Sequence, residues 1–123
     1  MGLRHLLDGF DPARVGAVWD AAHNALNGED AAHAVEIIWP QLCMVNLKNA
    51  FWRRTSGPEA EDVAWAPYWT SGRQGLASWP RVAELLRQRE YTGVVCLTAE
   101  YSDEAATGRL IAEDLAFARS LWA

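Results

Sequence analysis

Three short apolar runs, each followed by a helical pattern, constrain the fold of this chain most strongly. The runs cover residues 15–19, 42–47 and 94–99. Each run is nearly continuous in apolar residues and lacks clean alternation, which is typical of strands that are covered on both faces of a parallel sheet. We therefore predict three buried parallel strands.

Helical periodicity follows each run, over residues 31–38, 79–89 and 103–121. Asp30, Ser78 and Ser102 precede these segments and are suitable N-caps. The predicted buried stripe of the last helix consists of Thr107, Leu110, Ile111, Leu115, Ala118 and Leu121. The alternation of strand and helix predicts right-handed crossovers and an α/β fold with a parallel sheet.

A long loop is expected between the second strand and its helix, over residues 49–77. Long loops without secondary structure are uncommon and often functional. The aromatic cluster of Trp65, Tyr68 and Trp69 either walls a pocket or anchors this loop, and we favour anchoring. The adjacent Arg53 and Arg54 are expected to be solvated in it.

Charge and cysteine usage narrow the class of partner and the compartment. Eleven basic and sixteen acidic residues give a net charge of −5, which predicts no nucleic-acid partner and no membrane partner. No apolar run is long enough to cross a bilayer, and the first residues do not resemble a signal peptide, so a cytoplasmic location is expected. Cys43 and Cys96 lack metal-type spacing and are expected to be buried free thiols in neighbouring strands.

Polar residues stand where the three apolar runs end. Ligands of open and closed parallel α/β folds bind at the carboxyl ends of the strands, so these positions are the candidate site. They are Asp20 and His23 after the first strand, Asn46, Lys48 and Asn49 around the end of the second, and Glu100 after the third. Asp, His and Glu side chains are suitable ligands for a divalent cation such as Mn²⁺, Mg²⁺ or Zn²⁺.

Each of these residues also has an ordinary structural explanation. Asp20 is suited to capping the segment that follows it, and His23 to an exposed loop. Glu100 and Lys48 are both suited to solvated strand ends. The convergence of Asp20 and Glu100 is what favours a site. His5 and His33 have no acidic partner pattern, and we expect both to be structural or on the surface.

Four segments in order resemble the C-terminal part of the sugar phosphate isomerase/epimerase family, the xylose isomerase-like TIM barrels. They read VGAVWDAAH, MVNLKNA, GRQGLASWPRVAELLRQREYTGVVCLTAE and IAEDLAFARSLW, and the similarity covers residues 9–122. It implies that the single domain of residues 1–123 is a partial (β/α)₈ barrel. A full barrel needs about 250 residues, so the chain corresponds to the last three βα units.

The resemblance also implies a metal-assisted transfer of a proton between adjacent carbons of a sugar, through an enediol. Carried over by position, Asp20 and Glu100 are metal ligands, and Glu100 is also the candidate acid or base. His23 and Lys48 are placed to bind the sugar substrate, with Lys48 at the edge of the site. Asn46 stands at the position of the family's metal-binding His.

Two departures from the family pattern bear on these expectations. The amide of Asn46 is a weak neutral ligand, acceptable to Mg²⁺ but poor for Mn²⁺ or Zn²⁺. Asn49 replaces the usual Asp after the lysine. The remaining family ligand is a Glu from an earlier strand, which these three units do not include.

The sequence therefore leaves three functional interpretations open. The first is a sugar isomerase/epimerase of which the isolated chain is incomplete and inactive. The second is a non-catalytic carbohydrate-binding or interaction module derived from the barrel, favoured by Asn46 and Asn49. The third, a related endonuclease acting on abasic DNA, is disfavoured because only His23 is placed for a zinc cluster and because the chain is acidic. A three-stranded piece also leaves sheet edges unpaired, so we expect the isolated chain either to self-associate or to fold poorly.

Overall fold

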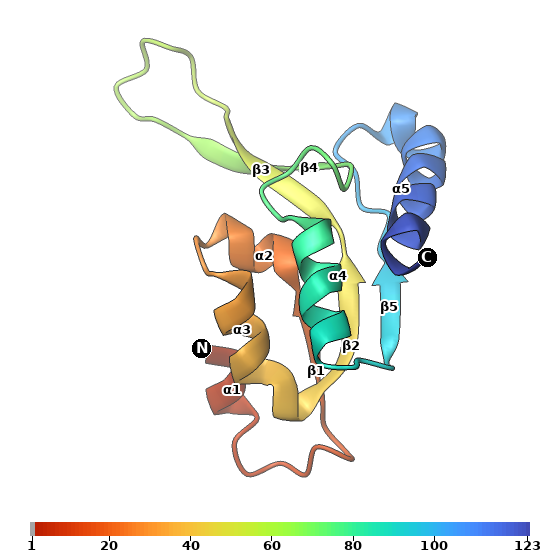
Figure 1. The fold of residues 1–123 in the computed structure, drawn as a ribbon. Helices are drawn as coiled ribbons and strands as arrows, with labels where there is room; N and C mark the ends of the chain where they lie inside the picture. Colours follow the sequence, from red (N-terminus) through yellow and green to blue (C-terminus); the bar gives the residue numbers. More distant parts are fainter. Residues whose placement is uncertain (1) are drawn as a thin grey trace.

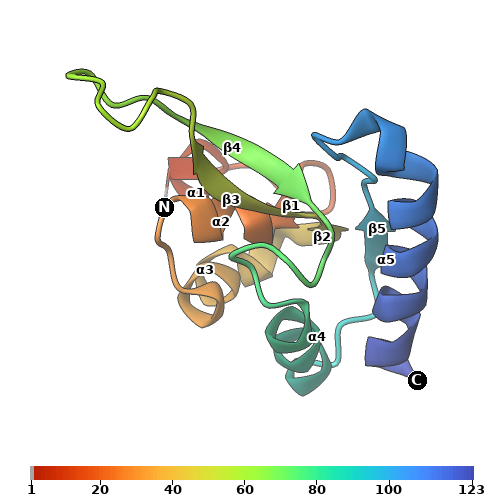
Figure 2. The same cartoon turned by 90° about the horizontal axis from the view of Figure 1, so that it is seen from above.

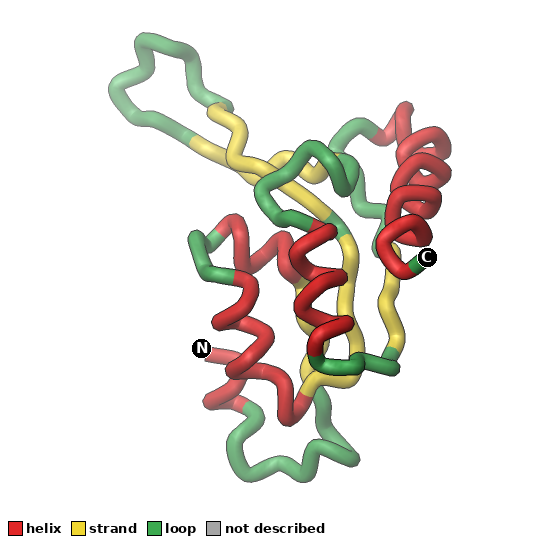
Figure 3. The backbone as a smooth tube through the Cα atoms, in the orientation of Figure 1, coloured by secondary structure: helices red, strands yellow, loops and turns green. Residues whose placement is uncertain are grey.

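The computed structural model describes residues 2–123 and has a mixed α/β fold (Figures 1 and 3). A three-stranded parallel sheet consists of β1 (Ala17–Asp20), β2 (Leu42–Leu47) and β5 (Val94–Leu97). An antiparallel hairpin consists of β3 (Asn49–Arg54) and β4 (Trp65–Thr70). The helices are α1 (Gly2–Leu6), α2 (Ala21–Leu26), α3 (Ala31–Ile38), α4 (Trp79–Gln88) and α5 (Thr107–Trp122), with short 3₁₀ turns at Trp39–Gln41 and Glu104–Ala106.

The parallel sheet has the strand order β1-β2-β5, so β2 lies in the middle. Its register aligns residues of the three strands into rows that cross the sheet. One row consists of Val18, Met44 and Val94, and the next towards the carboxyl ends consists of Asp20, Asn46 and Cys96. Since successive side chains of a strand point to opposite faces, both rows belong to the same face.

The opposite face of the sheet carries the core. Trp19, Val45 and Leu47 are buried there in one cluster with residues of α3 and α4. Figure 2 shows α3 and α4 together on this side of the sheet, with α5 beside them near β5. The rings of Trp79 in α4 and Phe117 in α5 stack at 5.6 Å between centroids, which joins these two helices.

The face that carries the two rows lacks a helical layer among residues 2–123. Val18 is 39% exposed and Val94 is 61% exposed, which is unusual for apolar residues in the strands of a parallel sheet. The prediction of a parallel sheet is confirmed, whereas the expectation that both of its faces are covered is wrong.

The segment expected to be an unstructured loop is largely a β-hairpin. In Figure 1 the ends of β3 and β4 extend beyond the helices, joined by residues 55–64. Its inner part is attached to α2, because the indole Nε1 of Trp52 donates a hydrogen bond of 2.9 Å to the carbonyl oxygen of Leu26. Arg53 and Arg54, expected in a solvated loop, are instead the last two residues of β3.

The other predicted elements agree closely with the structure. The strand at residues 42–47 and the helix at residues 31–38 have the predicted bounds, and the side chains of Asp30 and Ser78 cap their helices as expected. The short helix α2 was not predicted. The cap predicted at Ser102 is wrong, because Asp103 caps the 3₁₀ turn that precedes α5.

Two predictions about burial need correction. In α5, Leu115 is 39% exposed, and the buried residues are Asp114 and Phe117. Cys43 and Cys96 are free and lie in neighbouring strands, as expected, but Cys43 is exposed and Cys96 only half-buried. Within residues 2–123, no helix has the length and apolar character needed to cross a membrane.

Candidate functional site

Lys48 lies between two carboxylates at the carboxyl ends of the parallel strands. Its Nζ is 2.8 Å from Oε2 of Glu100, which follows β5, and 3.4 Å from Oδ2 of Asp20, the last residue of β1. Three residues separated by up to 80 positions in the sequence thus meet at one edge of the sheet, as the strand-end rule predicts. The Lys48 side chain is only 11% exposed, so it is not the solvated strand-end lysine of the ordinary explanation.

The two carboxylate oxygens of Asp20 have separate roles. Oδ1 accepts hydrogen bonds from the backbone N–H groups of Ala22 and His23, which caps the start of α2. Oδ2 faces the ammonium group of Lys48 and lies 3.9 Å from Nε2 of His23. The capping role is therefore confirmed, and the second oxygen of the same carboxylate contacts Lys48. The cap fixes the position of the carboxylate that contacts Lys48.

Trp69 of β4 forms a wall of the site. The Nζ of Lys48 lies 4.3 Å from the centroid of the Trp69 ring, a distance at which the ring face attracts a cation. The imidazole of His23 meets the same indole edge to face at 5.3 Å. Trp69 was predicted to wall a pocket or to anchor a loop, and in the structure it lies against two of the candidate site residues.

Glu100 is held by the residues that surround it in the chain. Ala99 has a φ of 54°, a left-handed conformation that residues other than glycine rarely adopt. The hydroxyl of Tyr101 donates a hydrogen bond of 2.8 Å to Oδ2 of Asp114 in α5. Ser102 makes two hydrogen bonds with the backbone of Trp69: its N–H donates to the carbonyl oxygen of Trp69, and its Oγ accepts from the N–H of Trp69. The contacts of Tyr101 and Ser102, directly after Glu100, fix the loop that carries its carboxylate.

Asp114 is a buried carboxylate that sequence reasoning missed. It is 3% exposed, and its Oδ1 accepts a hydrogen bond from the N–H of Gly72. Burial raises the pKa of Tyr101, and the hydrogen bond to Asp114 and the negative charge of that residue raise the same pKa further. The sequence did contain a signal for this buried carboxylate. Asp114 lies one helical turn after Leu110, so it is an acidic residue within the apolar stripe of the helix.

Asn46 and Asn49 have different surroundings. The Oδ1 of Asn46 is buried and lacks a hydrogen-bond partner, and Asn46 lies beside Asp20 in the register of the sheet. Asn49 is completely buried and fully hydrogen-bonded. Its Nδ2 donates to the carbonyl oxygens of Gly72 and Ala77, and its Oδ1 accepts from the N–H groups of Ala50 and Ala77. Asn49 is therefore a structural residue that fixes the loop before α4.

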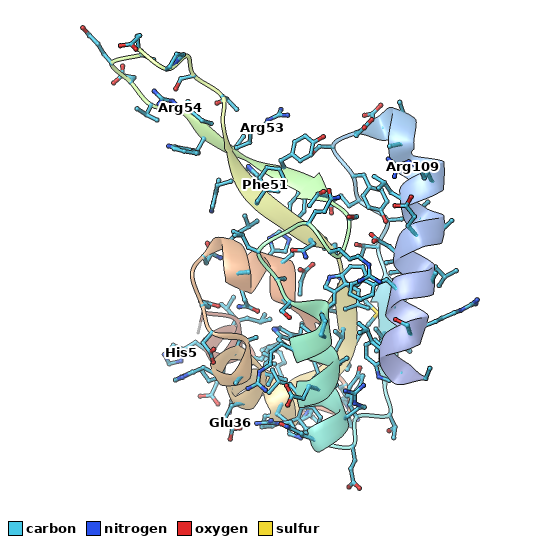
Figure 4. The ribbon with its side chains drawn as sticks, turned by 45° about the horizontal axis from the view of Figure 1, so that its top comes forward. His5, Glu36, Phe51, Arg53, Arg54 and Arg109 are labelled. Atoms are coloured by element: carbon cyan, nitrogen blue, oxygen red, sulfur yellow. The ribbon has the colours of Figure 1, made fainter. Side chains whose placement is uncertain are left out.

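A groove of about 470 Å³ opens beside the outer edge of β1, and Asp20 and His23 are among the residues that line it. Its floor is apolar, with Val18 and Ile38. His33 also lines this groove but is exposed, and His5 is exposed on α1 (Figure 4), so both histidines agree with the surface interpretation.

The metal ion implied by the resemblance was tested against the donors that the structure brings together. Within residues 2–123, no group of three or more His, Cys, Asp or Glu side chains is arranged to hold a metal ion. The carboxylates of Asp20 and Glu100 both face the ammonium of Lys48, so a divalent cation between them would have to displace it. The divalent ion with Asp20, Glu100 and Asn46 as ligands stays a prediction.

In comparisons with known proteins, no family model and no curated protein sequence matches the chain.

Proposed function

We propose that this chain is the C-terminal part of a cytoplasmic sugar isomerase/epimerase-type barrel and that it binds a sugar at Lys48. One observation carries the proposal: Asp20, Lys48 and Glu100 meet at the carboxyl ends of three adjacent parallel strands. Parallel α/β folds bind their ligands at this edge. A carboxylate, an ammonium and an indole ring provide hydrogen bonds to sugar hydroxyls and a surface for the apolar face of a sugar ring.

The same residues are suited to moving a proton between adjacent carbons. Such a reaction needs a base for the carbon-bound proton and an electrophile for the neighbouring carbonyl oxygen. The carboxylate of Glu100, whose side chain is 46% exposed, is the base in this proposal. It takes the proton, and the C–H electron pair forms the enediol double bond while the carbonyl oxygen gains negative charge. Lys48 donates a hydrogen bond to that oxygen. Glu100 then returns the proton to the former carbonyl carbon, while the hydroxyl proton of the enediolate moves to the former carbonyl oxygen, so that the neighbouring carbon becomes the new carbonyl.

Asp20 and His23 support this chemistry. The carboxylate of Asp20 holds the Lys48 ammonium at the strand ends, because it lies 3.4 Å from it. His23, 56% exposed and beside Trp69, is available to hydrogen-bond a sugar hydroxyl. We expect the isolated chain to bind sugar without turnover, because the remaining units of the barrel supply the rest of the site. An assay with Mn²⁺ and a panel of ketoses tests this, and turnover that Glu100→Ala abolishes would contradict it.

Binding of sugars to the isolated chain is the direct experiment. We expect saturable binding of a ketose or aldose from a panel, followed by the fluorescence of Trp69 and its neighbours and by calorimetry. Lys48→Met should abolish binding, because it removes the cation and leaves an apolar chain of similar length. Arg14→Met is the matched control, since the Arg14 side chain is 86% exposed and pairs only with its neighbour Asp11. Absence of binding across the panel, in a folded protein, would refute the proposal.

The alternative is a carbohydrate-binding module without catalysis. It is favoured by the ion pairs of Lys48, because both carboxylates already have a cationic partner and neither needs a metal to be stable. Sugar binding that is unchanged by a chelator supports this alternative. Metal-dependent turnover by a longer protein that contains this chain counts against it.

A further inference from the structure

One face of the β3–β4 hairpin carries three tryptophans. Paired residues of an antiparallel ladder share a face, and successive pairs alternate between the two faces. The pairs Ala50–Trp69, Trp52–Pro67 and Arg54–Trp65 therefore lie on the same face. We call Trp52, Trp65, Pro67 and Trp69 the tryptophan row.

The tryptophan row leads away from Lys48. Its inner end is Trp69, whose ring contacts the ammonium of Lys48. Its outer end is Trp65, four residues earlier in β4, which is roughly 13 Å away at the usual rise of a strand. Trp52 and Trp65 are diagonal neighbours across the hairpin, close enough for both rings to contact one ligand.

The outer part of the row is open to solvent. Trp52 is 45% exposed and Trp65 is 56% exposed, and Pro67 between them is also exposed. Two residues have a structural role in this part of the hairpin: the guanidinium of Arg54 holds the connecting loop through the carbonyl oxygens of Gly57 and Pro58, and the indole Nε1 of Trp52 donates a hydrogen bond to the carbonyl oxygen of Leu26. Figure 4 shows Arg54 at this outer part of the hairpin, away from the helices. Trp65, a large exposed indole without such a role, favours a binding surface, and the half-exposed ring of Trp52 lies beside it.

The charges around the row disfavour a phosphate-bearing ligand. The connecting loop contains Glu59, Glu61 and Asp62, whose carboxylates repel phosphates, and the chain has a net charge of −5. Arg53 is on the other face of the hairpin, stacked over Tyr68 at 4.5 Å. Arg54 shares the face of the row, and its guanidinium donates hydrogen bonds to the carbonyl oxygens of Gly57 and Pro58. A neutral ligand with flat apolar faces and polar edges matches the row better than a nucleic acid does. A saccharide chain has this character.

We propose that the tryptophan row binds the second and later rings of an oligosaccharide whose terminal sugar lies at Lys48. The inference rests on the proposed function and makes it narrower, because it names an oligosaccharide as the ligand class. Trp69 is common to the site and the row, which makes the two surfaces continuous. Trp52 and Trp65 are specificity residues: they contact the later rings but not the terminal sugar, and so raise the affinity for longer oligosaccharides.

The test compares the affinities of glucose, cellobiose and cellotetraose, or of the matching xylose series, by calorimetry. We expect the tetrasaccharide to bind about three- to tenfold more tightly than the monosaccharide, the gain of one or two aromatic contacts. Trp65→Ala should remove this gain and leave monosaccharide binding unchanged. Trp122→Ala is the matched control, because Trp122 is 38% exposed at the end of α5 and lies outside the row.

The outcomes separate this inference from the proposed function. Equal affinities for the monosaccharide and the tetrasaccharide would overturn the inference and leave the proposed function standing. A preference for the tetrasaccharide over the monosaccharide that survives Trp65→Ala would also overturn it, as would tetrasaccharide binding that survives Lys48→Met. Binding of a single-stranded oligonucleotide or a proline-rich peptide in place of any sugar would overturn both.

Discussion

At the scale of single residues, Asn49 shows that a departure from a family motif can have a structural cause. The resemblance places an Asp after the lysine, so Asn49→Asp should restore the motif if the position serves the site. In the structure the Nδ2 of Asn49 donates to two buried carbonyl oxygens. The surrounding space is also closed, because a Cβ added at Gly75 would lie 2.0 Å from the Oδ1 of Asn49.

We therefore predict that Asn49→Asp destabilises the protein by about 3 kcal/mol or more, because it buries a charge and removes two donors. Urea unfolding followed by tryptophan fluorescence measures this change. Asn46→Asp is the comparison, since it makes the same change from amide to carboxylate at a residue that is only half-buried. A stable Asn49→Asp protein with stronger ligand binding would show that the family motif explains this position better than the hydrogen bonds do.

Tyr101 links stability to pH. Its pKa is raised in the folded protein, first by burial and then by Asp114, so folding favours the neutral phenol. The resulting stabilisation is complete below the ordinary tyrosine pKa of about 10 and is lost as the pH rises through the folded value. Tyr101→Phe removes this dependence together with a hydrogen bond to a buried carboxylate.

At pH 8 we expect Tyr101→Phe to lower the free energy of unfolding by about 1–2 kcal/mol. The difference from the wild-type protein should shrink as the pH rises from 9 to 11, which denaturant titrations at several pH values can measure. A difference that stays constant over this range would mean that the phenol ionises equally in both states. Tyr91, whose pKa is also raised by burial, remains in both proteins and does not contribute to the difference.

At the scale of elements, the end of α4 has the hydrogen bonds of a Schellman motif with an unfavourable residue. The N–H of Tyr91 donates to the carbonyl oxygen of Leu86, and the N–H of Glu90 donates to that of Arg87. Glu90 has a φ of 53° in this motif, where glycine is strongly preferred.

We predict that Glu90→Gly stabilises the protein by about 0.5–1 kcal/mol. Thermal unfolding of Glu90→Gly and Glu90→Ala distinguishes the backbone effect from the loss of a carboxylate, because only glycine relieves the strain. Equal stabilities of the two variants would argue against a strained conformation at this position.

The elements that could be predicted from sequence are those whose signal is local. The strand at residues 42–47 and the helix at residues 31–38 contain their own apolar pattern and have flanking caps or breakers. The β3–β4 hairpin was missed because its two strands are joined by residues 55–64, without the short turn that identifies a hairpin, and because Pro67 in β4 argued against a strand. Pro67 is tolerated because a two-stranded hairpin consists only of edge strands.

The meeting of Asp20, Lys48 and Glu100 could be predicted from the strand ends alone, since it needs only parallel strands in adjacent positions. The contacts that fix these side chains could not be predicted in the same way. Trp69 comes to the site through the missed hairpin, and Asp114 reaches the site loop from α5 through Tyr101. Both contacts depend on how elements pack in space, which periodicity does not specify.

At the scale of the whole molecule, the uncovered face of the sheet predicts self-association of the isolated chain. Val18, Met44 and Val94 form an apolar row there, and within residues 2–123 the outer edges of β1 and β5 have no strand partner. Size-exclusion chromatography with light scattering should give an apparent mass above that of a monomer, or soluble aggregates. Val94→Lys should shift the protein towards the monomer, because it places a charge on the exposed row. A compact, stable wild-type monomer would contradict this prediction.

The central position of β2 makes some parts of the site more resistant to local unfolding than others. Its backbone is hydrogen-bonded on both sides, whereas β1 and β5 are each bonded on one side only. Native-state hydrogen exchange should therefore be slowest in β2 and faster in its two neighbours. Lys48 follows the most protected strand, whereas Asp20 is the last residue of β1 and Glu100 follows β5, the two strands that open first. Local opening would then separate the carboxylates from a cation that stays in place, without unfolding the centre of the sheet.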